Sequence, residues 1–157
     1  MAISDWSTTA LCTYTHVRDE YADVGDLTGE TVTANQNTVI TAYIAKAKIY
    51  IGRKLDVILR GKHSSEDYGA DADLKDLISN HSELQAAAVS YTLHLLFKDN
   101  ESSPDDYNAY KAEQYRLKFK DDFADGAALL RFDADASEDI DQEERAIGIG
   151  TNRFYRI

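Results

Sequence analysis

The stretch NTVITAYIAKAKIYIGRKLDVILR, residues 37–60, is the strongest folding signal in this chain. Its apolar residues recur at spacings of three and four, which is the repeat of one helical face. Asn35 or Asn37 can cap the start of the helix, and Gly61 is typical of a left-handed stop after its end. The apolar face therefore predicts a long amphipathic helix packed on a core; its residues are Ile40, Ile44, Ala47, Ile51, Leu55 and Ile58.

Two more strips run along the same predicted helix. Lys46, Arg53 and Arg60 recur every seven residues on the side opposite the core face. A second apolar strip lies between the two and also repeats every seven residues. We expect this strip either to contact another subunit or to be covered by a second helix of the same chain. The candidate subunit interface therefore comprises Tyr43, Lys46, Tyr50, Arg53, Val57 and Arg60.

Two further helices are predicted downstream. Ser82 and Gln85 form a capping-box pattern that opens a helix over residues 83–98, which is apolar on nearly every side and suits the centre of a bundle. Ser103 followed by Pro104 opens a more amphipathic helix that is expected to stop at Gly126.

The rest of the N-terminal region is less regular. Residues 6–21 are rich in threonine and predict a weaker helix, residues 23–36 and 62–73 read as loops, and residues 74–79 allow one short helical turn. The chain is therefore expected to be mainly α, with a small helical bundle over residues 1–126.

The pattern changes after Gly126. A short apolar run is followed by an acidic run, and residues 146–157 (AIGIGTNRFYRI) alternate glycines with basic and aromatic residues. We expect residues 127–157 to form an acidic C-terminal arm, extended or folded as a β-hairpin, that binds a partner. Its candidate contact residues are Ile147, Ile149, Arg153, Phe154, Tyr155 and Arg156.

Composition and charge exclude several classes of function. The chain has 157 residues and a formal net charge of −11, which argues against a general nucleic-acid binder. The single cysteine, Cys12, excludes an intrachain disulfide and is expected to be a small buried residue. No apolar stretch approaches the roughly 20 residues needed to span a bilayer, and the N-terminus lacks a signal-peptide pattern. A soluble protein without membrane contact is expected.

One acidic segment resembles a calcium loop. Oxygen-bearing residues fall at the positions from which an EF-hand supplies its ligands: Asp133, Asp135, Ser137, Asp139, Asp141 and Glu144. Glu138 occupies the sixth position, where the sharp turn of that loop requires glycine. Ca²⁺ is therefore a candidate ligand, and the alternative is an acidic segment that faces solvent or a partner. No other cofactor is expected to be required.

Catalytic patterns are missing from the sequence. His16, His63, His81 and His94 share no zinc-ligand spacing, and His94 is expected to be a satisfied buried side chain. The chain has no GxSxG, P-loop or GxGxxG motif. We therefore expect a binding protein rather than an enzyme.

The order of helices resembles the head–tail connector (adaptor) proteins of tailed bacteriophages. That family pairs a helix of the type A-x-x-YI-x-x-L with an Ala-rich helix and then a Tyr/Lys-rich helix. The resemblance covers about residues 37–125. The matching positions are Ala47, Tyr50, Ile51 and Leu55, then Ala87, Ala88, Tyr91 and Leu95, then Tyr107, Tyr110 and Lys111.

The resemblance implies a structural protein of the virion, located at the head–tail junction after assembly in the host cytoplasm. Members form a homo-oligomeric ring, commonly twelvefold, between the portal protein and the tail or stopper protein. The C-terminal arm reaches the portal, and the ring extends the channel through which DNA passes without sequence-specific binding. An acidic protein suits such a conduit, because like charge keeps the passing duplex from sticking.

Overall fold

The computed structural model describes residues 5–28, 34–62 and 73–132, and these residues are mainly helical, as the sequence predicts. The α-helices are α1 (Tyr14–Glu20), α2 (Ala34–Lys62), α4 (Gln85–Asp99) and α5 (Tyr107–Leu129). Three short 3-10 helices join them: η1 (Ala22–Thr28), η2 (Leu74–Leu77) and η3 (His81–Leu84). No strand forms within these ranges, where the one β-bridge pairs Ile78 with Phe132.

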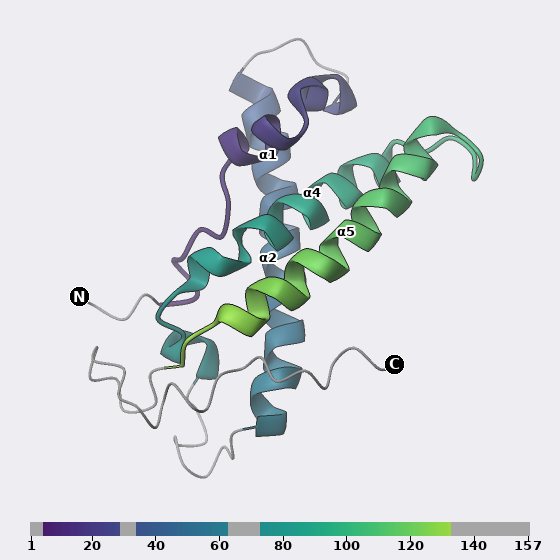
Figure 1. Cartoon of the computed structure of the whole chain (residues 1–157). Helices are drawn as coiled ribbons and strands as arrows, with labels where there is room; N and C mark the ends of the chain where they lie inside the picture. Colours follow the sequence, from purple (N-terminus) through teal and green to yellow (C-terminus); the bar gives the residue numbers. More distant parts are fainter. Residues whose placement is uncertain (1–4, 29–33, 63–72, 133–157) are drawn as a thin grey trace.

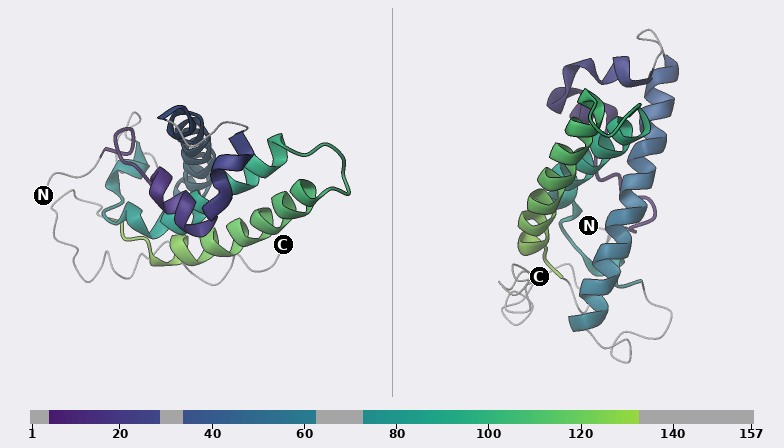
Figure 2. Two further views of the ribbon diagram at one scale, coloured as in Figure 1. Left: turned by 90° about the horizontal axis from the view of Figure 1, so that it is seen from above. Right: turned by 90° about the vertical axis from the view of Figure 1, so that its right-hand side faces the viewer.

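The centre of the bundle is a helical hairpin crossed by a long helix. α4 and α5 lie side by side and antiparallel, and α2 passes behind them, mainly against α4 (Figure 1). The two views of Figure 2 show α1 and η1 capping one end of the crossing. α4 is thus surrounded by α2, α5 and α1, which agrees with a sequence that is apolar on nearly every side.

The periodicity of α2 correctly predicts its core face. Ile40, Ala47, Ile51 and Leu55 are fully buried, and Ile44 and Ile58 pack beside them. The predicted ends of α2 are wrong: the helix begins at Ala34, before both expected caps, and it continues through Gly61 to Lys62.

The expected starts of α4 and α5 also need correction. α4 follows the 3-10 helix η3 directly, and its N-cap residue is Leu84. No side chain caps this end of the helix, so the predicted capping box of Ser82 and Gln85 does not form. α5 is capped by Asp106 rather than Ser103, because the Asp106 carboxylate accepts a hydrogen bond from the Ala109 amide at 2.7 Å. That carboxylate also accepts from the amides of residues 102 and 103, and these bonds hold its pKa well below the usual range.

Gly126 is a contact point rather than a helix stop. A Cβ at this position would lie 2.4 Å from the carbonyl oxygen of Glu83, so glycine lets α5 pass against the start of α4. The helix continues to Leu129, and Leu130 and Phe132 are buried in the core. Residues 127–132 therefore pack with the bundle.

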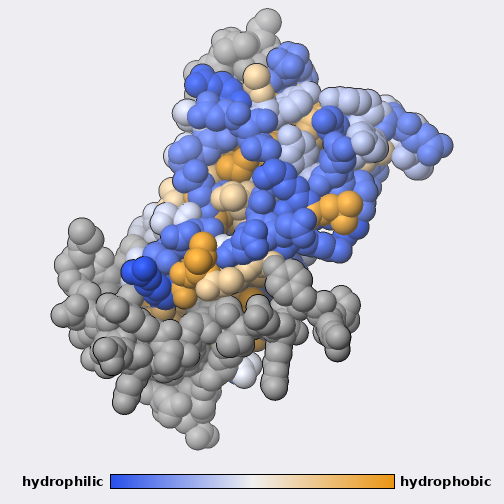
Figure 3. Space-filling model, viewed as in Figure 1, coloured by the Kyte–Doolittle hydropathy of each residue, from blue (hydrophilic) through white to orange (hydrophobic). Residues whose placement is uncertain are grey.

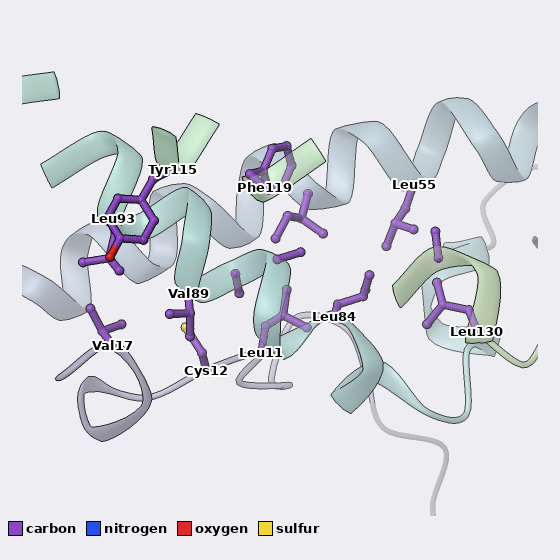
Figure 4. Close-up of a cluster of buried hydrophobic side chains, with 14 of the residues drawn as sticks. Leu11, Cys12, Val17, Leu55, Leu84, Val89, Leu93, Tyr115, Phe119 and Leu130 are labelled. Carbon is purple, nitrogen blue, oxygen red and sulfur yellow. The ribbon is translucent and has the colours of Figure 1, made fainter. Parts of the chain in front are cut away.

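The core contains side chains from every layer. Figure 4 shows residues of the N-terminal segment, α2, α4 and α5 pointing into one cluster. Cys12 is buried there, as predicted, and burial raises the pKa of its thiol to about 11. A thiol protonated at neutral pH is a packing residue rather than a nucleophile.

The N-terminal segment attaches to α2 through Trp6. Gly52 leaves room for the indole, whose ring atoms lie 3.3 Å from where a Cβ would be. The Trp6 amide donates to the Asp76 carboxylate at 2.6 Å, which joins the segment to η2. The first helix begins only at Tyr14, where Thr13 and His16 form a capping box, and η1 replaces part of the loop expected over residues 23–36.

His81 makes the stability of this junction depend on pH. The residue is 4% exposed, and its Nε2–H donates to the carbonyl of Lys75 at 2.9 Å. Burial lowers the pKa of His81 below its usual 6.5, more than the hydrogen bond and Asp76 raise it. The folded chain therefore binds fewer protons at this site than the unfolded chain, so stability is lost as the pH falls below 6.5.

We expect the free energy of unfolding to fall between pH 7.5 and pH 5.5 more steeply in the wild type than in His81→Gln. Urea titrations at both pH values measure the difference. Parallel pH dependence in the two proteins would remove His81 as the cause.

Candidate interaction surface

The side of α2 that points away from α4 is a continuous exposed surface. Lys46, Ile49, Arg53, Val57 and Arg60 follow one another at spacings of three and four, and all five are exposed. Ile49 is 57% exposed and Val57 is 75% exposed. We call these five residues the α2 outward face. It spans about 21 Å from end to end at 1.5 Å per residue.

The positive charge of this face is not neutralised within the bundle. Asp56 is the one acid in residues 37–60 that could balance it. Its carboxylate instead pairs with the ammonium of Lys75 on η2 at 2.6 Å, on the side of the helix that faces the protein. Arg53 and Arg60 make no ion pair with any described residue, and the Lys46 ammonium lies 4.3 Å from the Tyr43 ring centroid. The face therefore presents three cations and no anion.

The Lys75 site fixes how α2 sits on the short helices. Lys75 is 8% exposed, and its ammonium also contacts the Asp73 carboxylate at 2.9 Å. These two carboxylates raise the pKa of Lys75 against the lowering effect of its burial. Both acids are therefore needed to satisfy the buried ammonium.

Asp56→Ala is expected to lower the free energy of unfolding by about 1–2 kcal/mol, because it leaves a buried ammonium short of a partner. Lys75→Met removes the buried charge itself and is expected to cost less. Chemical denaturation of the two variants measures the order. A larger loss for Lys75→Met would contradict this assignment.

The sequence left two alternatives for the second apolar strip of α2: contact with another subunit, or cover by a second helix of the same chain. The residues of the strip do not all follow the same alternative. Tyr50 stacks on Tyr91 of α4 with centroids 4.2 Å apart and also contacts Phe119 of α5. The Tyr43 hydroxyl donates to Asp99 at 2.6 Å. Neighbouring helices of the same chain therefore contact both tyrosines, and of this strip only Val57 lies on the outward face.

Ile49 belongs to the outward face and was missed from the sequence. It lies three residues after Lys46 and four before Arg53, so helical spacing places it on the basic stripe. The sequence pattern does not place Ile49 on this face, because Ile49 falls in neither of the two seven-residue repeats.

One polar cluster carries residue types found in catalytic sites. Between α4 and α5 the Ser90 hydroxyl donates to the Asp122 carboxylate, which also pairs with the Lys118 ammonium at 2.9 Å. Ser90 is completely buried, so no substrate can reach its hydroxyl. The cluster joins two helices. His94 similarly connects them, since its Nδ1 lies 2.9 Å from the carbonyl of Ala112. The ring is satisfied, as expected, but it is half-buried rather than buried.

Two sets of predicted residues lie outside the described residues. They are the candidate calcium ligands at 133–144 and the arm contacts at 147–156, and both remain predictions. Within the described ranges, no group of three or more histidine, cysteine or acidic side chains could hold a metal ion. No described helix combines the length and apolar character of a membrane span.

No family model, curated protein or solved structure matches this chain.

Proposed function

We propose that the chain is a structural head–tail adaptor of a tailed bacteriophage, assembling as a ring between the portal and the tail or stopper protein. The observation that carries the proposal is the α2 outward face. It places two open apolar side chains among three cations that make no ion pair with any described residue, on the longest described helix.

Such a face suits contact with another protein. Buried at an interface, Ile49 and Val57 would lose their contact with water, and the flanking cations would set orientation and partner choice. A solvated helix surface would not need both apolar residues in line with the bases. The net charge of −11 favours a protein partner over DNA.

The helix order is the second support. A long amphipathic helix, an apolar Ala-rich helix and a Tyr-rich helix follow one another, as in the phage adaptors that the sequence resembles. In the proposed ring, the bundle of residues 5–132 forms the wall, and the acidic composition keeps passing DNA from adhering.

Deleting the gene from the phage that encodes it tests the proposal. The expected result is DNA-filled heads that accumulate without tails, rescued by the wild-type chain in trans. The variant Lys120→Glu changes charge outside the α2 outward face, so it is expected to rescue the deletion as the wild-type chain does. Normal tailed particles from the deletion would overturn the proposal.

A further inference from the structure

A second exposed surface lies at the end of the bundle formed by α1, η1 and the start of α5. Asp19, Glu20, Asp23 and Asp26 are exposed within eight residues of chain, together with one base, Arg18. In Figure 3 this end, at the top, is mostly hydrophilic. We call the four acids together with Tyr107 and Tyr110 the acidic–aromatic end.

The two parts of this surface are joined by Tyr21. Tyr21 and Tyr107 both contact the ring of Phe97 edge-on, with ring centroids 5.1 Å and 6.5 Å from it. Partial burial raises the pKa of Tyr21, and the nearby charges of Asp23 and Asp26 add to the shift. Tyr107 is 59% exposed, and Tyr110 on the next turn of α5 is 61% exposed. Asp23 and Asp26 therefore lie near Tyr21 and Tyr107, and Tyr110 exposes a further ring on the next turn of α5.

Within the described part of the chain, two of the four acids at this end have no cation partner. Arg18 lies 3.9 Å from Asp19, and Lys118 lies 3.8 Å from Glu20. No described cation lies within ion-pair distance of Asp23 or Asp26. The acidic–aromatic end thus has the composition that the α2 outward face lacks: unpaired anions beside exposed rings, which can bind both cations and apolar side chains.

We propose that the acidic–aromatic end of one copy binds the α2 outward face of a second copy. This inference deepens the proposed function, on which it rests, by naming the two surfaces that meet between subunits. Asp23 and Asp26 would pair with Arg53 and Arg60, and Tyr107 and Tyr110 would cover Ile49 and Val57.

The arrangement of the two surfaces makes this contact head-to-tail. The α2 outward face points away from α4, whereas α1, η1 and the start of α5 pack on other sides of the bundle (Figure 2). Two α2 outward faces cannot meet each other, since that would place cations against cations. A contact between different surfaces leaves one of each free on every pair, so copies continue to add, and they form a closed ring when the rotation from one subunit to the next returns to the first.

Two double variants test the pairing. Arg53→Glu/Arg60→Glu reverses the α2 outward face, and Asp23→Lys/Asp26→Lys reverses the acidic–aromatic end; all four side chains are exposed, so folding is retained. Each variant alone is expected to self-associate at least about 100-fold more weakly than the wild type, because each attraction becomes a repulsion.

Mixing the two variants tests whether the contact joins two different surfaces or the same surface of both copies. Asp23→Lys/Asp26→Lys keeps an intact α2 outward face, and Arg53→Glu/Arg60→Glu keeps an intact acidic–aromatic end. An equimolar mixture is therefore expected to form one-to-one dimers that grow no further. Sedimentation velocity distinguishes these dimers from monomers and larger species, and circular dichroism checks that each variant is folded.

Carrying all four reversals in one chain is expected to restore self-association, since both surfaces change sign together. Lys120→Glu and Asp121→Lys, single charge reversals on the exposed side of α5 outside both surfaces, are the controls and should associate like the wild type. A further variant, Asp139→Lys/Asp141→Lys, reverses charge in the acidic segment.

Three results would overturn the proposal: a wild type that stays monomeric at its highest soluble concentration, a mixture that stays monomeric, or loss of association only in Asp139→Lys/Asp141→Lys. The last result would identify the acidic segment as the partner of α2. These outcomes concern self-association alone, so they are separate from the deletion phenotype that tests the proposed function.

Discussion

Gly126→Ala is expected to destabilise the bundle by about 3 kcal/mol, the upper end for overpacking, because no flexible side chain can yield to the added methyl group. The new Cβ would lie 2.4 Å from the Glu83 carbonyl oxygen and 3.2 Å from the carbonyl carbon, both backbone atoms. Either α5 must shift away from η3, or the turn that starts α4 must deform. Thermal and urea unfolding measure the loss.

Gly61→Ala is the matched control for Gly126→Ala. Gly61 also lies within a helix, but no atom comes within 4 Å of where its Cβ would be. Alanine there is expected to leave stability unchanged or raise it by up to about 1 kcal/mol, through helix propensity alone. Equal losses at the two positions would contradict the close contact assigned to Gly126.

Phe97→Ala is expected to cost about 3–5 kcal/mol, the usual range for removing a fully buried ring. Phe97 stacks on Tyr115 of α5 with centroids 5.6 Å apart and meets the edges of Tyr21 and Tyr107. It therefore supports both parts of the acidic–aromatic end from below. Denaturant unfolding measures the stability, and sedimentation velocity of the folded fraction is expected to show weaker self-association.

Tyr110→Ala tests whether Tyr110 contributes to self-association without contributing to the stability of the bundle. Tyr110 is exposed, and its hydroxyl accepts a hydrogen bond from the Gln114 side chain one turn later. Removing it is expected to change the free energy of unfolding by less than about 0.5 kcal/mol. Self-association should nevertheless weaken. A variant that is as stable and as associated as the wild type would exclude Tyr110 from the contact.

The parts of the fold that follow from local periodicity could be predicted from the sequence. The core face of α2 needed only the spacing of Ile40, Ala47, Ile51 and Leu55, and all four are buried. The ends of the helices were harder to predict, because a glycine can either stop a helix or let another part of the chain pass close to it. Gly61 and Gly126 both follow apolar runs and suggest stops, yet one faces open space and the other meets a backbone from elsewhere in the chain. Only the tertiary contacts of each glycine show which of the two roles it has.

The candidate surface was predicted in part for a similar reason. The heptad spacing of Lys46, Arg53 and Arg60 placed the basic stripe on the side away from the core. Which tyrosines faced outward depended on where α4 crosses α2, and no local pattern contains that information. The acidic–aromatic end joins residues about 80 positions apart through Tyr21 and Tyr107, so its existence depends on the fold.

The proposed assembly into a ring is tested most directly by electron microscopy of the purified wild type, alone and mixed with the portal protein of the same genome. Closed rings of identical subunits, free or seated on the portal, are the predicted result. Single bundles under both conditions would contradict it.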